Sequence, residues 1–80
     1  MLNHGYTIQV GVTCFLVVAP NKKLAKKLAL DVSSSTEKAV GVGRTDDLTG
    51  LRANGKEISL DEQAVYRYSA LTRVAHTRRQ

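Results

Sequence analysis

Two short stretches of the chain carry residue types that could do chemistry. Gly41-Val42-Gly43 follows a predicted strand and begins like the glycine-rich loop that holds the phosphates of a dinucleotide. The third glycine of that motif is missing, because Asp46 stands in its place, and no helix is predicted to follow. Asp46 and Asp47 are adjacent carboxylates, but acids paired for catalysis must converge on one point. We therefore expect a strand of small residues followed by a solvated turn.

Residues that could bind a metal or act as a nucleophile are few. The chain has one cysteine, Cys14, and two histidines, His4 and His76. A structural zinc site needs four Cys or His ligands at defined spacing, and three residues cannot supply them. Cys14 falls on the apolar face of a predicted strand, where a thiolate is costly to form. We predict no catalytic residue, no metal, no cofactor and no enzymatic activity, with a small oligomeric enzyme as the remote alternative.

The composition is that of one small basic domain, and we predict a single domain over residues 1–80. The 12 Lys and Arg against 7 Asp and Glu give a formal net charge of +5. Such a charge favours an anionic partner, although it also serves solubility alone. A single cysteine cannot form an intrachain disulfide, so nothing argues for an oxidising compartment. We therefore expect a cytoplasmic protein.

The longest uncharged apolar stretch, Val10 to Ala19, is predicted to be a strand. It is shorter than the ~20 residues that span a bilayer, and it lacks the flanking signals of a signal peptide, so we expect no membrane partner. From Tyr6 onward alternate residues are apolar, which predicts one strand to Val18 with these on one face: Tyr6, Ile8, Val10, Val12, Cys14, Leu16 and Val18. The opposite face becomes apolar from Phe15, as in a central strand buried on both faces. A hairpin that turns near Gly11 is the alternative, but it would break the single apolar face.

A helix is predicted after Pro20. Asn21 is a good N-cap, and the following residues to Val32 have helical periodicity. The apolar face consists of Leu24, Ala25, Leu28, Ala29 and Val32, and the opposite face carries Lys22, Lys23, Lys26 and Lys27. Leu30 is predicted to project from the middle of the lysines. Residues 33–36 are expected to end the helix and form a loop.

The second half of the chain predicts strands, a hairpin and a second helix. Residues 39–44 could form a strand, and Asn54-Gly55 predicts a type I′ turn that joins residues 51–53 to residues 56–58. Ser59 and Glu62 have the spacing of a capping box, and the apolar stripe beyond them predicts a helix to about His76. Residues 77–80 are expected to form a frayed basic tail.

These elements predict an α/β (α+β) fold with the order β-α-β-β-α. We expect a three- or four-stranded sheet, mixed or antiparallel, with both helices packed on one face. An exposed strand edge could pair two copies of the chain, which would give a homodimer.

Positive charge is concentrated on the two predicted helices. Lys22 and Lys23 stand in a first helical turn, where the helix dipole disfavours cations but favours a bound phosphate or carboxylate. A solvated lysine face is the alternative. On the last helix, Tyr66 and Arg73 fall on an outward face, and an exposed Tyr near an Arg suits base stacking or a protein contact. The predicted partner-binding residues are Lys22, Lys23, Lys26, Lys27, Leu30, Tyr66, Arg67, Arg73, Arg78 and Arg79.

Together these features predict a non-enzymatic binding protein that docks on a larger anionic protein or nucleoprotein through basic helix faces. In size, charge and α/β order the chain resembles some anti-CRISPR inhibitors, which bind nucleoprotein effectors and block their nucleic-acid or target sites. The resemblance implies an inhibitor encoded by a phage or mobile element, and because no motif carries it, it assigns no residue. A nucleic-acid-binding module that contacts the phosphate backbone is the alternative, although aromatic residues are few for a stacking platform.

Overall fold

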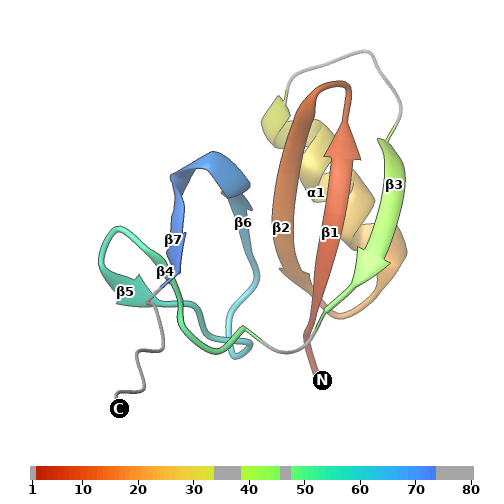
Figure 1. Cartoon of the computed structure of the whole chain (residues 1–80). Helices are drawn as coiled ribbons and strands as arrows, with labels where there is room; N and C mark the ends of the chain where they lie inside the picture. The colour runs from red at the N-terminus through yellow and green to blue at the C-terminus, as the bar shows by residue number, and fades with distance from the viewer. Residues whose placement is uncertain (1, 34–38, 46–47, 74–80) are drawn as a thin grey trace.

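The computed structural model of the chain describes residues 2–33, 39–45 and 48–73, and for residues 39–42 and 73 it describes the backbone alone. Its elements, in chain order, are β1 (His4–Val10), β2 (Thr13–Ala19), α1 (Lys22–Ser33), β3 (Ala39–Arg44), β4 (Leu51–Ala53), β5 (Lys56–Glu57), β6 (Ala64–Arg67), the short 3₁₀ helix η1 (Tyr68–Ala70) and β7 (Leu71–Arg73) (Figure 1).

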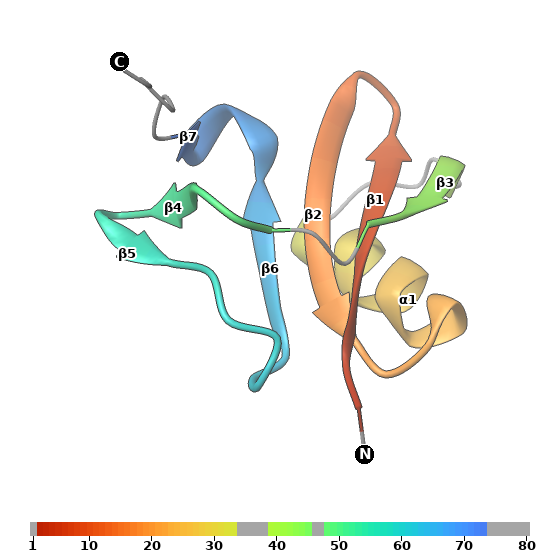
Figure 2. The same ribbon diagram turned by 60° about the horizontal axis from the view of Figure 1, so that its bottom comes forward.

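The strands form two antiparallel sheets. The larger sheet has the order β3-β1-β2-β6 and the smaller sheet has the order β5-β4-β7. Helix α1 lies against one face of the larger sheet and the smaller sheet lies on the opposite side (Figure 2). The predicted β-α-β-β-α order with two helices on one face is therefore wrong, because the region assigned to the second helix contains the strands β6 and β7.

The apolar stretch near the N-terminus forms a hairpin and not the predicted single strand. Val10 pairs with Thr13, so Gly11 and Val12 alone make the turn. Gly11 has a φ of 62° whereas Val12 does not have a positive φ, as a type II′ turn requires. Because of the turn, odd-numbered residues of β2 lie on the same face of the sheet as even-numbered residues of β1. Tyr6, Ile8 and Val10 therefore share a face with Phe15 and Val17, and not with Leu16 and Val18.

Strand β2 is the centre of the fold and supplies side chains to two hydrophobic cores. Phe15, Leu16, Val17 and Val18 are fully buried, which confirms that the second half of the stretch is covered on both faces. The first core lies between the larger sheet and α1 and contains Tyr6, Ile8, Val10, Phe15, Val17, Ala19, Ala25 and Ala29. The second core lies between the two sheets and contains Leu16, Val18, Leu48, Leu51 and Ile58.

Helix α1 confirms the prediction for residues 22–32. The Asn21 side-chain oxygen accepts a hydrogen bond of 2.8 Å from the amide of Leu24, which is the expected N-cap interaction. Ala25 and Ala29 are buried against the sheet, and their small side chains allow a close approach of the helix. Helix α1 connects β2 to β3, which run parallel to each other but are separated by β1. The predicted crossover is thus present, but its strands are not neighbours.

The Asn54-Gly55 hairpin is also confirmed. Asn54 and Gly55 have φ values of 54° and 79°, and they join β4 to β5 as a type I′ turn does. The predicted strand at residues 39–44 is β3 and pairs with β1, with a register shift opposite residues 7–9.

The predicted C-terminal helix is wrong, because residues of that segment pair with both sheets. Strand β6 pairs with β2, η1 turns the chain, and β7 pairs with β4. The Ser59 hydroxyl accepts a hydrogen bond of 3.0 Å from the amide of Asp61, so it caps a turn and not a helix. A single sheet with helices on one face would leave Leu16 and Val18 exposed, whereas β6 and the smaller sheet cover them.

Candidate anion-binding surface

Four lysines in the first half of α1 form the most concentrated positive charge that the described residues contain. We call Lys22, Lys23, Lys26 and Lys27 the lysine face; Lys26 is half-buried and the other three are exposed. The first turn holds no acid and the last turn holds no base, so the charges add to the positive end of the helix dipole. No ion pair with an acid neutralises these lysines within the described part of the chain. The lysine face therefore presents unshared positive charge to solvent.

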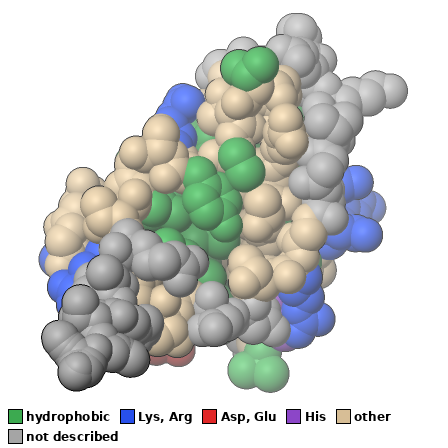
Figure 3. Space-filling view, in the orientation of Figure 1, with side chains coloured by type: hydrophobic (Ala, Val, Ile, Leu, Met, Phe, Trp, Pro, Cys, Tyr) green, Lys and Arg blue, Asp and Glu red, His purple; other side chains and the backbone are tan. Residues whose placement is uncertain are grey.

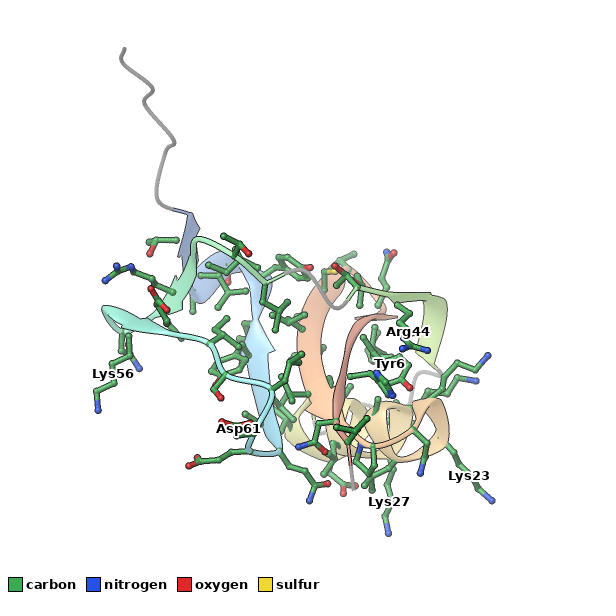
Figure 4. All side chains as sticks on the ribbon, turned by 90° about the horizontal axis from the view of Figure 1, so that it is seen from below. Tyr6, Lys23, Lys27, Arg44, Lys56 and Asp61 are labelled. Carbon is green, nitrogen blue, oxygen red and sulfur yellow. The ribbon has the colours of Figure 1, made fainter. Side chains whose placement is uncertain are left out.

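A small cavity adjoins the start of α1. Its lining consists of Tyr6, Lys22, Gly43 and Arg44, and its volume is about 310 Å³. Strand pairing explains how residues far apart in sequence meet there, because Tyr6 lies directly opposite Arg44 in the β1–β3 ladder. Tyr6 and Arg44 lie next to each other, whereas Lys23 and Lys27 extend outward from α1 (Figure 4).

The guanidinium group of Arg44 is held by a histidine. Its Nη2 atom lies 2.8 Å from Nδ1 of His4. Since arginine can only donate, His4 accepts this bond through Nδ1. The His4 ring also makes an edge contact with the ring of Tyr6, with the ring centroids 6.4 Å apart. Three residues of the sheet thus support one another at the side of the cavity.

The residues around this cavity were not among the predicted binding residues, apart from Lys22. Arg44 ends a correctly predicted strand, but its neighbour across the sheet depends on the β1–β3 register, which the sequence pattern does not determine. His4 was considered only as a metal ligand.

Leu30 is not the exposed apolar residue that the helical periodicity predicts. It is half-buried and packs against the first core. The contact between α1 and the sheet therefore extends to Leu30, which was predicted to lie among the exposed lysines. Lys26 is half-buried as well. Leu30 thus contributes to packing, and we no longer count it among the candidate contact residues.

The second predicted cluster does not form, because its residues lie on strands. Tyr66 is half-buried and packs against the second core. Arg67 is exposed, and its guanidinium carbon lies 5.4 Å from the centre of the Phe15 ring, which is a cation–π contact. Only the backbone of Arg73 is described, and Arg78 and Arg79 lie outside the described residues, as do His76 and the predicted tail.

Negative charge is gathered away from the lysine face. Glu57, Asp61 and Glu62 are exposed on and after β5. In Figure 4, Lys56 lies at the far side of the molecule from Lys23 and Lys27, and Asp61 lies between them. In the view of Figure 3, hydrophobic side chains occupy the middle of the face and Lys and Arg side chains lie at its edges. Arg52, Lys56 and Arg67 lie in the same part of the chain as these acids, so positive charge without nearby acids is found on α1 among the described residues.

The other residues tested for chemistry do not form a site. Gly41-Val42-Gly43 lies within β3, as expected, and Asp46 and Asp47 fall outside the described residues. Burial raises the pKa of the Cys14 thiol, which opposes formation of a nucleophilic thiolate. No group of three or more His, Cys, Asp or Glu side chains is close enough to hold a metal ion among the residues that the structure covers.

Over the described ranges, no helix has the length and apolar character needed to cross a membrane. Comparison of the chain with known protein families, curated proteins and solved structures finds no match. Function is therefore argued from the charges and the geometry of the chain itself.

Proposed function

We propose that this protein is a non-enzymatic binding domain that docks, through the lysine face of α1, on an acidic surface of a larger protein or nucleoprotein. The observation that carries the proposal is the concentration of four lysines at the positive end of a helix dipole, without ion pairs to described acids. Such an arrangement costs helix stability, by about 0.3–1 kcal/mol for each misplaced charge. An anionic partner would convert this cost into a favourable interaction.

The aromatic residues favour a protein surface over a single-stranded nucleic acid. The chain has three Tyr, one Phe and no Trp, and Tyr6, Phe15, Tyr66 and Tyr68 are all buried or half-buried. Bases of a single strand stack on exposed aromatic rings, which this surface does not offer. The charge distribution also supports docking, because the described acids of residues 57–62 stand with Arg52, Lys56 and Arg67, whereas the lysine face would meet an acidic partner with positive charge alone.

The alternative is a module that contacts the phosphate backbone of a duplex, and the exposed lysines favour it to the same extent as an acidic protein. The resemblance to anti-CRISPR inhibitors rested partly on the β-α-β-β-α order, which the fold does not have. Small size and basic charge are what remain of it, so it adds no residue to the proposal.

The experiment that tests the proposal is fluorescence anisotropy with four labelled probes: an acidic glutamate-rich peptide, duplex DNA, single-stranded DNA and single-stranded RNA, each titrated over a range of salt concentrations. We expect binding to the acidic peptide at low salt that weakens as salt screens the charges. Preference for duplex DNA, with log affinity falling linearly and steeply with log salt, would favour the nucleic-acid alternative. Absence of binding to every probe at low salt would contradict both.

A further inference from the structure

We propose that the acidic partner binds as an extended segment, which adds a strand to the outer edge of β3. The inference deepens the proposed function, on which it rests, by naming the conformation of the partner and the place where its backbone docks. The partner is a protein segment with acidic side chains at alternate positions, because alternate residues of a strand lie on the same face.

Strand β3 is an edge strand of the larger sheet. It pairs with β1 on one side, and within the described part of the chain no strand pairs with its other side. Figures 1 and 2 both show β3 as the outermost strand, with no other strand beyond it. The outward N–H and C=O groups of an edge strand are a template for an added strand, and many peptides are recognised in this way.

The sequence of β3 lacks two of the devices that commonly protect an edge. The strand is six residues long and contains neither proline nor lysine. The β1–β3 ladder has a register shift opposite residues 7–9, and the last two residues of β3 pair regularly with β1 beyond it. An added strand would therefore find ordinary antiparallel geometry at this end of β3, which is the end beside the first turn of α1.

Two members of the lysine face lie on the flank of α1 that is nearer to β3. Lys22 and Gly43 line the same small cavity, which places the start of α1 beside the end of β3. Lys26 follows one turn later on the same side of the helix and is half-buried. Leu30, a further turn along, packs against the first core, as expected for a flank that faces the sheet. A strand added to β3 would therefore have positive charge beside the face that it turns toward α1.

The spacing of these two lysines matches the spacing of alternate residues in a strand. Four residues of an α-helix rise by ~6 Å, and two residues of a strand rise by ~6.6–6.8 Å. Because α1 runs obliquely along the strands (Figure 1), acids at positions i and i+2 of an added strand would each have one lysine nearby. Adjacent acids would point to opposite faces, and only one of them would face α1.

A second copy of this chain suits the edge less well than an acidic segment. Antiparallel pairing of two β3 strands about a twofold axis would place both α1 helices on the same face of the joined sheet. Lys22 and Lys26 of the two copies would then approach each other, and like charges repel. The other edges lack this concentration of positive charge, because β5 contains Glu57, and Asp61 and Glu62 precede β6. Charge complementarity therefore favours an acidic segment on β3.

The test uses the full chain and labelled peptides in which glutamate and threonine alternate. Two further versions carry N-methyl groups on alternate residues, one in each register, so that each loses the N–H donors of one side of the strand and keeps its charge. One version should bind about tenfold more weakly or worse, because it loses hydrogen bonds to β3, and the other should bind as the parent does. Unchanged affinity of both versions would overturn strand addition.

A peptide of the same composition with its glutamates in one block tests the alternate pattern. It should bind at least about threefold more weakly than the alternating peptide, because fewer of its acids face α1. Equal affinity of the two peptides would contradict the alternate pattern. Lys26→Gln should weaken binding of the alternating peptide more than Lys27→Gln, the matched control at the next position, which points away from the sheet. Equal effects in the two folded variants would place the partner elsewhere on α1.

Hydrogen exchange and ¹H–¹⁵N NMR locate the bound peptide. The alternating peptide should shift the amides of β3 in a saturable way and slow their exchange, and it should leave the amides of β5 unchanged. Shifts confined to α1 would overturn the proposal. If N-methylation has no effect while Lys23→Glu still weakens binding of the unmodified peptide, strand addition is wrong and the proposed function stands. If no acidic peptide binds at low salt, both fail.

Discussion

The Nη2 atom of Arg44 lies 2.8 Å from Nδ1 of His4, which joins the last residue of β3 to the first residue of β1. This bond predicts the effect of His4→Phe, which keeps an aromatic ring beside Tyr6 but removes the acceptor. An exposed hydrogen bond of this kind contributes about 1 kcal/mol, so the free energy of unfolding should fall by no more than that amount. Urea denaturation measures this change, and a loss well above about 1 kcal/mol would show that His4 contributes more to stability than this bond.

Gly5 is predicted to be intolerant of substitution because the backbone of residue 45 crosses it. The Thr45 amide donates to the Gly5 carbonyl oxygen at 2.8 Å, and a Cβ on Gly5 would collide with the Thr45 carbonyl oxygen. Gly5→Ala should therefore destabilise the domain by about 1–3 kcal/mol, the usual cost of overpacking. Gly43→Ala is the matched control, because a Cβ there meets nothing within 4 Å. If thermal unfolding gave equal melting temperatures for the two variants, the close approach of residue 45 to β1 would be wrong.

Tyr66 distinguishes the observed strand from the helix that periodicity predicts. An outward position on a helix would let Tyr66→Ala change the stability by less than about 0.5 kcal/mol. In β6, Tyr66 lies opposite Leu16 and packs against the second core, so we expect a loss of about 1–3 kcal/mol. For a domain of this size that corresponds to a fall in melting temperature of roughly 4–8 °C per kcal/mol. A fall in melting temperature of less than about 2 °C corresponds to less than about 0.5 kcal/mol and would argue against the strand.

Cys14 is predicted to react slowly with thiol reagents. Burial raises the pKa of its thiol above the ordinary value of 9.0, so less thiolate is present at any pH near neutrality. The rate of alkylation by iodoacetamide should rise at higher pH in the folded chain than in the chain unfolded by urea. The unfolded thiol loses its proton first, so the contribution of Cys14 to stability is full below pH 9.0 and declines as pH rises through the folded pKa. Coincident pH profiles for the folded and unfolded chains would contradict the burial of Cys14.

Local sequence signals predicted an element correctly where the backbone conformation at one or two positions favours a particular residue type. Asn54-Gly55 predicts its turn because both residues tolerate positive φ, and Asn21 predicts its cap because its side chain reaches a free amide. These two signals fixed the β4–β5 hairpin and the start of α1. Neither depends on the rest of the chain.

Signals that depend on long-range pairing were misleading. The alternation from Tyr6 to Val18 continues with one parity through Gly11, and only the turn at that glycine shows that the two halves face opposite ways. Ser59 and the periodic apolar residues after it favour a helix locally. In the structure this segment instead supplies β6, which pairs with β2, and β7, which pairs with β4. Tertiary pairing thus overrides helical propensity in this segment.

The candidate site divides in the same way. The lysine face follows from the helical periodicity of α1 and was predicted except for the burial of Leu30. The cavity lined by Tyr6, Lys22, Gly43 and Arg44 depends on the β1–β3 register, which places Tyr6 opposite Arg44. It also depends on the position of the first residue of α1 beside them. A sequence pattern assigns residues to faces, but it does not determine which strands become neighbours.

The central claim is that the lysine face of α1 binds an acidic partner, and single charge reversals test it most directly. Lys23→Glu and Lys56→Glu each change the charge by the same amount at an exposed lysine, but only Lys23 belongs to the lysine face. The measurement is fluorescence anisotropy of the labelled glutamate-rich peptide at low salt, with circular dichroism to verify folding. We predict that Lys23→Glu weakens binding by about tenfold or more, that adding Lys27→Glu weakens it further, and that Lys56→Glu changes it by less than about twofold. Equal losses for Lys23→Glu and Lys56→Glu would show that net charge alone drives binding, which would contradict a defined site on α1.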